Sequence, residues 1–456
     1  MIKQYLQIKS QYPDSILFFR MGDFYEMFFE DARVGSRELD IALTSRDKGQ
    51  KDSVPLCGVP HFAAETYISK LLQKGYKVAL CDQVEDPKLA KGIVKREVVR
   101  VFTPGLVTDS IQLGTGENNY LMGFYAEGEV FGVAFLDIST GELKACQISG
   151  LEPFLSEALR NEPKEILSLK RFQEHPCFEG FKKNFENGLI TYLDDPPFDA
   201  LSSFTEKERN SVIRKAPLAA QAVVMVLHYA EENQKKPLSH VHPVSFYRVQ
   251  DFMVIDEVTK RNLELTQSLF EQGKRGSLFW LLDETITLMG SRTLRQWLNY
   301  PLIDVEEIER RLEGVSELKE KIIERKRLRE SLKGIQDVER LTSRIFLGPM
   351  QDVSLGARED LLPLLTPEVV EVALRRLDCG TFAGIDGGWQ VVWPILGDLA
   401  YRFRMAGGAS EMAFDSHGAR KYGPEFLTSF SWLYINALLR ECRQVDLSLP
   451  QLSRYF

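Results

Sequence analysis

Phe24 is the first residue whose type and position could do specific chemistry. We expect a helix beginning at Asp23, because Glu26 follows three residues later in the position of a capping box. The buried stripe of this helix would consist of Tyr25, Phe28, Phe29 and Ala32. Phe24 lies roughly 90° from the centre of that stripe, so we expect its ring to be partly exposed. An exposed ring can stack on bases or act as a wedge in distorted DNA. Spacing alone nevertheless favours a core phenylalanine and a purely capping Glu26.

Other residues that could do chemistry are poorly grouped for it. Asp137 and Glu165 fall near strand ends, but a two-metal nuclease needs a larger carboxylate cluster, and no further acidic residue in a strand run completes one. His240 and His242 lack the cysteine or carboxylate spacing of a metal site, which favours surface or packing histidines. We therefore predict no catalytic residue, no bound cofactor and no metal ligand in this chain.

Composition narrows the class of protein. The 456 residues suggest about three domains. A net charge of -8 excludes a generally basic nucleic-acid coat, although it leaves room for a local DNA site. The six cysteines form no C-x-x-C pair, which fits a reducing compartment. The N-terminus lacks a signal-peptide pattern, and the most apolar stretch, 216–230, is typical of a buried helix rather than a membrane span. We expect a cytoplasmic protein without membrane contact.

Short strands and helices alternate through the first part of the chain. Strands are predicted at 16–19, 78–81 and 98–102, and a helix at 63–72 with Gly75 in the C-cap region. Residues 103–105 form a turn signal. These elements indicate a small mixed α/β domain that would position Phe24.

The remaining elements fall into two groups. Strand-like runs at 120–124 and 131–136, a turn at 137–142 and a strand entry at 163–167 indicate a second α/β domain. From about Asp256, apolar residues recur at three- and four-residue spacing, which predicts long helices. The charged run 321–329 could be a DNA patch, but a solvated helix face is favoured.

Several motifs now occur in one order that resembles a known family. The run FFRMGDFYEMF at 18–28 closely resembles the mismatch-recognition segment of the bacterial DNA mismatch repair MutS family. The resemblance continues at 39–44, 57–61, 64–67, 82–87 and 103–105. It extends over about 100 residues and favours an exposed Phe24 over a core one.

The resemblance implies roles for individual residues. In the family, the phenylalanine of a Phe-x-Glu motif enters the minor groove and stacks on a mispaired or unpaired base, and the glutamate hydrogen-bonds to that base. These roles carry over to Phe24 and Glu26. The resemblance also places Met21 beside the wedge, and Arg46 and Arg100 toward the DNA, where arginines would fix register through phosphates. An ordinary solvated surface charge remains the alternative for each arginine.

The resemblance also implies a division of the chain. Residues 1–113 would be the mismatch-recognition domain, 114–245 a connector with a ribonuclease H-like fold, and 246–370 an all-helical core or lever segment. The family implies double-stranded DNA with mismatches or small loops as ligand, a MutL-like repair partner that binds the connector, and a homodimer. The core segment would transmit changes without catalytic residues.

The resemblance fades after about Leu365. A family member continues through a clamp domain into an ATPase that uses ATP and Mg, but the printed sequence contains no G-x-x-x-x-G-K-[ST] motif. We therefore expect a truncated chain with little or no ATP hydrolysis and doubtful dimerisation. Residues 371–456 show no family motif, and we hypothesise a reading-frame shift near 365–378. A diverged, genuinely short paralogue is the alternative.

Overall fold

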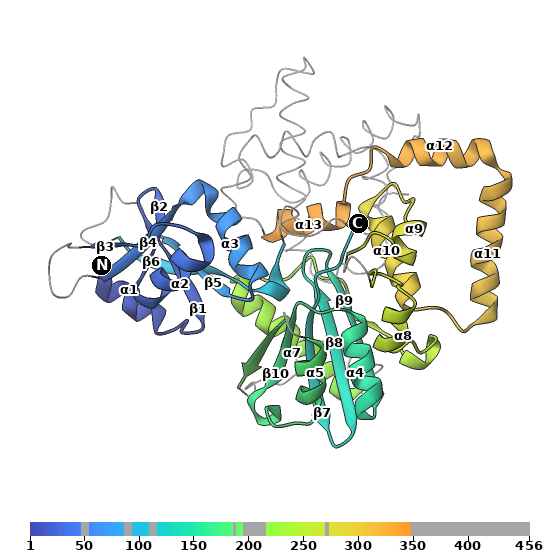
Figure 1. Ribbon diagram of the computed structural model, residues 1–456, viewed down its shortest axis with the longest axis horizontal. Coiled ribbons are helices and arrows are strands. Elements are labelled where there is room, and N and C mark those ends of the chain that lie inside the picture. Colours follow the sequence, from blue (N-terminus) through green and yellow to red (C-terminus); the bar gives the residue numbers. More distant parts are fainter. Residues whose placement is uncertain are drawn as a thin grey trace, which may run out of the picture. The chain divides into compact units, whose positions relative to one another are not determined.

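The computed structural model describes residues 1–46, 54–85, 94–108, 116–185, 188–194, 216–269 and 273–347 (Figure 1). The chain divides into two compact units, Met1–Leu347 and Gly348–Phe456. All described residues belong to the first unit, so the predicted tail, 371–456, lies outside them.

The N-terminal part is built on a six-stranded sheet in the order β3-β4-β2-β1-β5-β6 (Figure 1). Its strands are β1 (Ser15–Met21), β2 (Phe24–Phe28), β3 (Thr44–Arg46), β4 (Val54–Pro60), β5 (Lys77–Gln83) and β6 (Arg96–Phe102). Its helices are α1 (Ile2–Lys9), α2 (Phe29–Leu39), η1 (His61–Ala63), α3 (Ala64–Gln73) and η2 (Pro104–Leu106). The mixed α/β character, the three predicted strands and the predicted helix at 63–72 are confirmed. Gly75 follows α3 with φ +81°, as expected at a helix end.

The sheet has a core on each face. One cluster contains Phe18, Tyr25 and Met27 together with residues of α2 and α3. The other contains Phe19 and Phe28 with Tyr5 of α1. Successive residues of β1 and β2 therefore enter opposite cores, as the two-residue period of a strand requires.

The predicted helix beginning at Asp23 is wrong. Residues Phe24–Phe28 form strand β2, and helix α2 begins only at Phe29. Glu26 lies inside the strand and caps no helix. The helical spacing arose because an extended strand runs directly into a helix, so Tyr25 and Phe28 matched a 3.6-residue period although they face opposite cores. The turn at Gly22 and Asp23 lets β2 pair with β1, and this pairing outweighs the helical spacing.

A second six-stranded sheet follows, in the order β11-β10-β7-β8-β9-β12. Its strands are β7 (Leu121–Glu127), β8 (Val130–Asp137), β9 (Glu142–Ser149), β10 (Glu165–Leu169), β11 (Leu189–Leu193) and β12 (Ser245–Phe246). Its helices are α4 (Leu151–Arg160), η3 (Lys170–Phe172), α5 (Cys177–Asn184) and α7 (Pro217–Gln234). The α/β prediction for this part is confirmed.

Helix α7 lies very close to the second sheet. A Cβ added to Gly132 of β8 would stand 1.9 Å from the backbone of Leu218. Only glycine permits this approach, so the apolar stretch predicted as a buried helix packs directly on the sheet. Among the described residues, no helix is long and apolar enough to cross a membrane.

The last described part is helical, as predicted. It contains η5 (Val249–Asp251), α8 (Glu257–Asn262), α9 (Leu278–Leu282), α10 (Leu288–Asn299), α11 (Val305–Glu320), α12 (Ile322–Leu332) and α13 (Val338–Leu347). Several of these helices begin with a side-chain cap. Hydrogen bonds from backbone N–H groups of the first turn are accepted by the side chains of Ser277, Thr287 and Asp304. The charged run 321–329 lies on α12, which buries none of its residues, so a solvated face is the better description.

Candidate nucleic-acid interface

A tight hairpin places Phe24 at the end of a strand. Strands β1 and β2 pair from Phe19–Glu26 to Met21–Phe24, so only Gly22 and Asp23 connect them. Gly22 has φ +59°, as in hairpin turns that place glycine first. A Cβ at Gly22 would meet nothing within 4 Å, so the turn requires glycine for its backbone conformation and not for space.

Phe24 and Glu26 share one face of β2. They are two residues apart on a strand, so their side chains project to the same side. Phe24 is 47% exposed and Glu26 is half-buried, whereas Tyr25 and Met27, on the opposite face, are buried. The sheet thus holds the backbone of the pair rigidly while the ring of Phe24 reaches solvent.

Contacts on both sides fix this hairpin. The Tyr25 hydroxyl donates a hydrogen bond of 2.8 Å to Asp82 of β5, and the Arg20 guanidinium lies 5.3 Å from the Tyr25 ring centroid. Burial, with the bond to Asp82, raises the pKa of Tyr25 above its usual value, so the hydroxyl stays a donor at neutral pH. The backbone N–H of His61 donates to the Asp23 carbonyl at 2.9 Å. The turn is therefore tied to the segment that follows β4.

Gly58 leaves room for the Glu26 side chain. The two residues are Cα partners between β2 and β4. A Cβ at Gly58 would stand 3.3 Å from the Tyr25 carbonyl oxygen and 3.5 Å from Glu26 Cγ. On the other side, Phe19 is the Cα partner of Glu26, and the Arg96 guanidinium lies 5.1 Å from the centroid of its ring. The carboxylate of Glu26 therefore stands on a face that also carries a positive charge.

Comparisons with known protein families match three successive segments of the chain. Family models match MutS domain I over residues 1–111, MutS domain II over 119–242 and MutS domain III over 258–378. Through residue 378, the chain belongs to the MutS family.

Individual relatives agree with this assignment. The chain is similar to the DNA mismatch repair protein MutS of Acetivibrio thermocellus, with 45% identity over 360 residues, covering 76% of this chain and 41% of the relative. It is also similar to the proteins of that name from Ruminiclostridium cellulolyticum, with 45% identity over 399 residues, and Desulforamulus reducens, with 41% over 389 residues. These alignments cover 83% of this chain and 46% and 45% of the relatives. The chain spans less than half the length of the curated relatives it matches.

Of the supporting residues that MutS resemblance suggests, Met21 lies nearest to Phe24. It is the Cα partner of Phe24 across the hairpin and is half-buried at the edge of the Phe19 core. Met21 is therefore a cross-strand neighbour of Phe24, and a direct DNA contact for it remains a prediction.

The two arginines lie away from Phe24. Arg46 pairs with Val54 at one end of β4, whereas Phe24 pairs with Pro60 at the other end, about 20 Å along the strand. The side chain of Arg46 lies outside what the structure describes. Arg100 belongs to β6 and faces the core of Phe18, on the opposite side of the sheet from Phe24. Its guanidinium donates a hydrogen bond of 2.8 Å to the Thr108 hydroxyl. The structure thus places Arg100 away from the Phe24–Glu26 pair, and it places the backbone of Arg46 beside the other end of β4.

The sequence had indicated no function for Phe62. It is 83% exposed, more than any other large apolar side chain among the described residues. It lies in η1, directly after the strand that pairs with Phe24. The aromatic residue just past the motif at 57–61 was the available signal.

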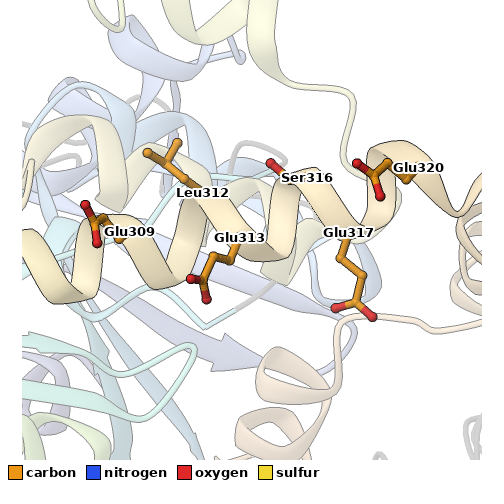
Figure 2. A pocket seen from close by; sticks show the side chains of 6 residues that line it. All are labelled: Glu309, Leu312, Glu313, Ser316, Glu317 and Glu320. Carbon is orange, nitrogen blue, oxygen red and sulfur yellow. The ribbon is translucent and has the colours of Figure 1, made fainter.

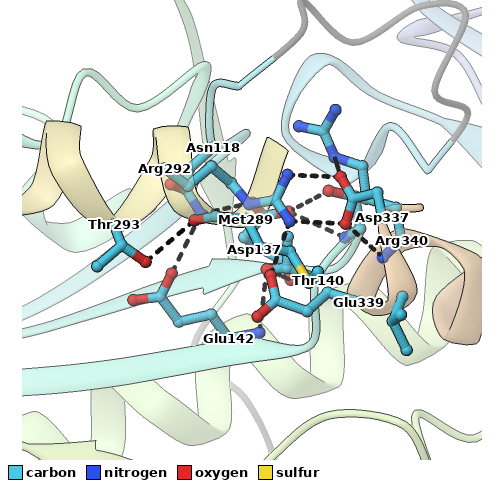
Figure 3. Close-up of polar contacts among 12 residues, drawn as sticks. Asn118, Asp137, Thr140, Glu142, Met289, Arg292, Thr293, Asp337, Glu339 and Arg340 are labelled. Carbon is cyan, nitrogen blue, oxygen red and sulfur yellow. Dashed lines mark hydrogen bonds and ion pairs between the residues drawn. The ribbon is translucent and has the colours of Figure 1, made fainter. Parts of the chain in front are cut away.

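In this MutS-family chain, the carboxylates of Asp137 and Glu165 are buried and accept hydrogen bonds from neighbouring residues. Asp137 is fully buried and accepts a hydrogen bond from Asn118 at 3.0 Å (Figure 3). It also accepts a hydrogen bond of 2.6 Å from the Ser139 hydroxyl. Burial raises its pKa. Glu165 accepts from the hydroxyls of Thr103, Thr191 and Tyr229 at 2.5–2.7 Å. No cluster of three metal-ligating side chains occurs in the part of the chain that the structure describes.

The two histidines for which a surface or packing role was favoured are His240 and His242. His240 is buried, its Nε2 lies 3.0 Å from the Ile138 carbonyl oxygen, and its ring stacks on Phe346. His240 is therefore a packing residue. His242 is exposed.

An open hollow on α11 is unsuited to DNA. Four glutamates project from successive turns of the helix there, beside Leu312 and Ser316 (Figure 2). The glutamates are Glu309, Glu313, Glu317 and Glu320. Their charge repels phosphates, so this surface does not extend the candidate interface.

Proposed function

We propose that this chain recognises mispaired or unpaired bases in duplex DNA, with Phe24 as a wedge that enters the minor groove. The observation that carries the proposal is the pairing of an exposed ring with a carboxylate on one face of a glycine-turned hairpin. The similar relatives are named DNA mismatch repair protein MutS, which also supports the proposal. The wedge, its ligand and its contacts are inferred for this chain.

The physics of a mismatch favours such a wedge. A mispaired base is weakly stacked and its step is flexible, so kinking the duplex there costs less than at a paired step. Inserting Phe24 restores stacking, which is worth about 1–3 kcal/mol per base in single-stranded systems. A rigid strand lowers the entropy cost of holding the ring in place. Discrimination therefore comes from the difference in deformation energy between mismatched and paired DNA.

Glu26 would sharpen that discrimination. A carboxylate near DNA is repelled by phosphates, so it opposes binding to any duplex. A displaced base can offer the carboxylate a hydrogen-bond donor that a paired base keeps for its partner. Glu26 then penalises matched DNA more than mismatched DNA.

Further properties of the family are carried to this chain only as proposals. They are the division at residues 113 and 245, a MutL-like partner at the connector, homodimerisation and a cytoplasmic location. The ribonuclease H-like fold of the connector is also inferred; three antiparallel strands, β7 to β9, continue through β10 and β11 in parallel, which supports it. An inert or protein-interaction fragment is the alternative function.

A gel-shift titration separates recognition from the alternative. The purified chain is titrated against a duplex with one G·T mismatch and its matched counterpart, at two salt concentrations. Recognition predicts tighter binding to the mismatch at both salts, with both affinities falling as salt rises. Equal binding to the two duplexes at low salt would favour the alternative.

A further inference from the structure

Phe62 is an exposed aromatic side chain that stands next to the wedge. We propose that Phe62 forms a second apolar contact to DNA, packing against a deoxyribose of the strand that Phe24 kinks. This inference rests on the proposed function and adds a residue to that surface.

The exposure of Phe62 is unusual for its type. The residue is 83% exposed, and its ring meets the His61 ring edge-on at 6.0 Å between centroids. A fully buried phenylalanine gains about 1.5–3 kcal/mol relative to an exposed one. A lone exposed apolar residue is ordinary, so the position of Phe62 decides its meaning.

That position is fixed relative to Phe24. Pro60, the last residue of β4, is the Cα partner of Phe24, and Phe62 comes two residues later in η1. The neighbouring His61 donates its backbone N–H to the Asp23 carbonyl at 2.9 Å, and its ring Nδ1 lies 3.1 Å from the same oxygen. The turn that carries Phe62 is therefore fastened to the turn that carries Phe24.

The separation matches a few nucleotides of DNA. Strand pairing and chain geometry put the Cα atoms of Phe24 and Phe62 within roughly 13 Å. At about 3.4 Å per base pair, this is at most about four steps. A ring there meets sugars along the edges of the minor groove once the groove opens around Phe24. The carbon face of deoxyribose suits an apolar ring, and a sugar contact needs no particular base.

Photo-crosslinking tests the contact directly. p-Benzoylphenylalanine, whose excited ketone inserts into nearby C–H bonds, replaces Phe62, Phe24 or Leu43 in the full chain. Leu43 is the matched control, because it is 48% exposed in the same domain but directly precedes β3, which β4 separates from β2. We expect position 62 to crosslink a G·T duplex within about four nucleotides of the mismatch, and position 43 not to do so.

Affinity measurements give the second readout. Phe62→Ala should weaken G·T binding about three- to tenfold and leave matched-duplex binding within twofold. In a Phe24→Ala background, the same change should have no further effect, because the opened groove is lost.

The possible failures are distinguishable. Crosslinks from position 24 at the mismatch, without any from position 62, overturn the Phe62 contact while the wedge stands. Crosslinks from position 62 scattered along the duplex overturn its placement. A wild-type chain without mismatch preference, and without crosslinks from position 24, overturns the proposed function and this inference together.

Discussion

Glu26 is a negative charge on a surface that we propose meets phosphates. Its backbone is fixed in the middle of a sheet, opposite Phe19 and Gly58, so the carboxylate cannot move far from the wedge. A charge that weakens binding to all DNA improves selectivity only if it weakens binding to matched DNA more than binding to mismatched DNA. The role of Glu26 is therefore measured by the ratio of the affinities for mismatched and matched DNA, and not by either affinity alone.

Replacing Glu26 should separate affinity from selectivity. Glu26→Ala should tighten binding to matched DNA severalfold, because a repelled charge is removed, and should reduce the mismatch preference. Competition titrations with matched and G·T duplexes measure both. Glu30→Ala, at an exposed position on α2, is the control and should leave the ratio unchanged. An unchanged ratio in Glu26→Ala would remove the proposed role of Glu26.

His240 makes stability depend on pH. Burial, with the nearby His242, lowers the pKa of His240 to about 4, so the unfolded chain binds a proton below about pH 6.5 that the folded chain refuses. The contribution to stability is therefore full above pH 6.5 and is lost as pH falls toward 4, by up to about 1.4 kcal/mol per pH unit. The urea midpoint of His240→Gln should fall less than that of the wild type between pH 7 and 4.5. The exposed-site variant His228→Gln should behave like the wild type, and equal pH dependence in all three would contradict this assignment.

At the scale of elements, the hairpin of β1 and β2 carries the candidate site. Spacing alone favoured a core position for Phe24, on a helix that is a strand in the structure, and the family resemblance favoured the exposed ring that the structure shows. Local spacing could not distinguish a five-residue strand running into a helix from one longer helix, because both place apolar residues three and four apart. Strands flanked by clear turn signals, such as β5 and β6, were predictable. The position of Arg100 on the opposite sheet face was not, because it depends on the pairing of β5 with β6.

The turn glycine has a matched control in the second sheet. Gly22 and Gly128 both connect hairpin strands through two residues, with φ +59° and +58° and open space around a Cβ. Alanine at either position should cost about 1 kcal/mol, because it must adopt a left-handed backbone. Thermal unfolding should show similar losses for Gly22→Ala and Gly128→Ala, whereas only Gly22→Ala should lower the mismatch preference. Equal effects on DNA binding would mean that the turn does not position Phe24.

At the scale of the molecule, buried carboxylates join segments that are far apart in the sequence. Glu165 of β10 accepts from Thr103 and the Gly105 N–H, just after the first sheet, and from Thr191 and Tyr229 in the second α/β part. A Cβ at Gly105 would stand 2.8 Å from Glu165 Cβ, so the turn at 103–105 closes directly on this carboxylate. The sequence predicts that turn and the strand of Glu165 separately. Their contact joins the backbone N–H of Gly105 to a side chain 60 residues later and had no local signal.

Loss of this carboxylate should destabilise the chain. Glu165→Ala leaves three hydroxyls and one backbone N–H without their buried acceptor, at a cost of about 3 kcal/mol or more. The midpoint of urea unfolding, followed by circular dichroism, should fall clearly. Glu179→Ala, an exposed glutamate on α5, should leave the midpoint nearly unchanged. A Glu165→Ala midpoint as high as that of the control would show that these bonds contribute little.

The proposal that Phe24 is the mismatch wedge is tested by the ratio of the dissociation constants for matched and G·T duplexes, measured by competition for the wild-type chain and Phe24→Ala. Phe24 is half-exposed, so its replacement removes little core packing, and Leu43→Ala serves as an exposed-site control. We expect a clear preference for G·T in the wild type and the control, and a ratio near one in Phe24→Ala. A Phe24→Ala variant that keeps the wild-type preference would contradict the proposal.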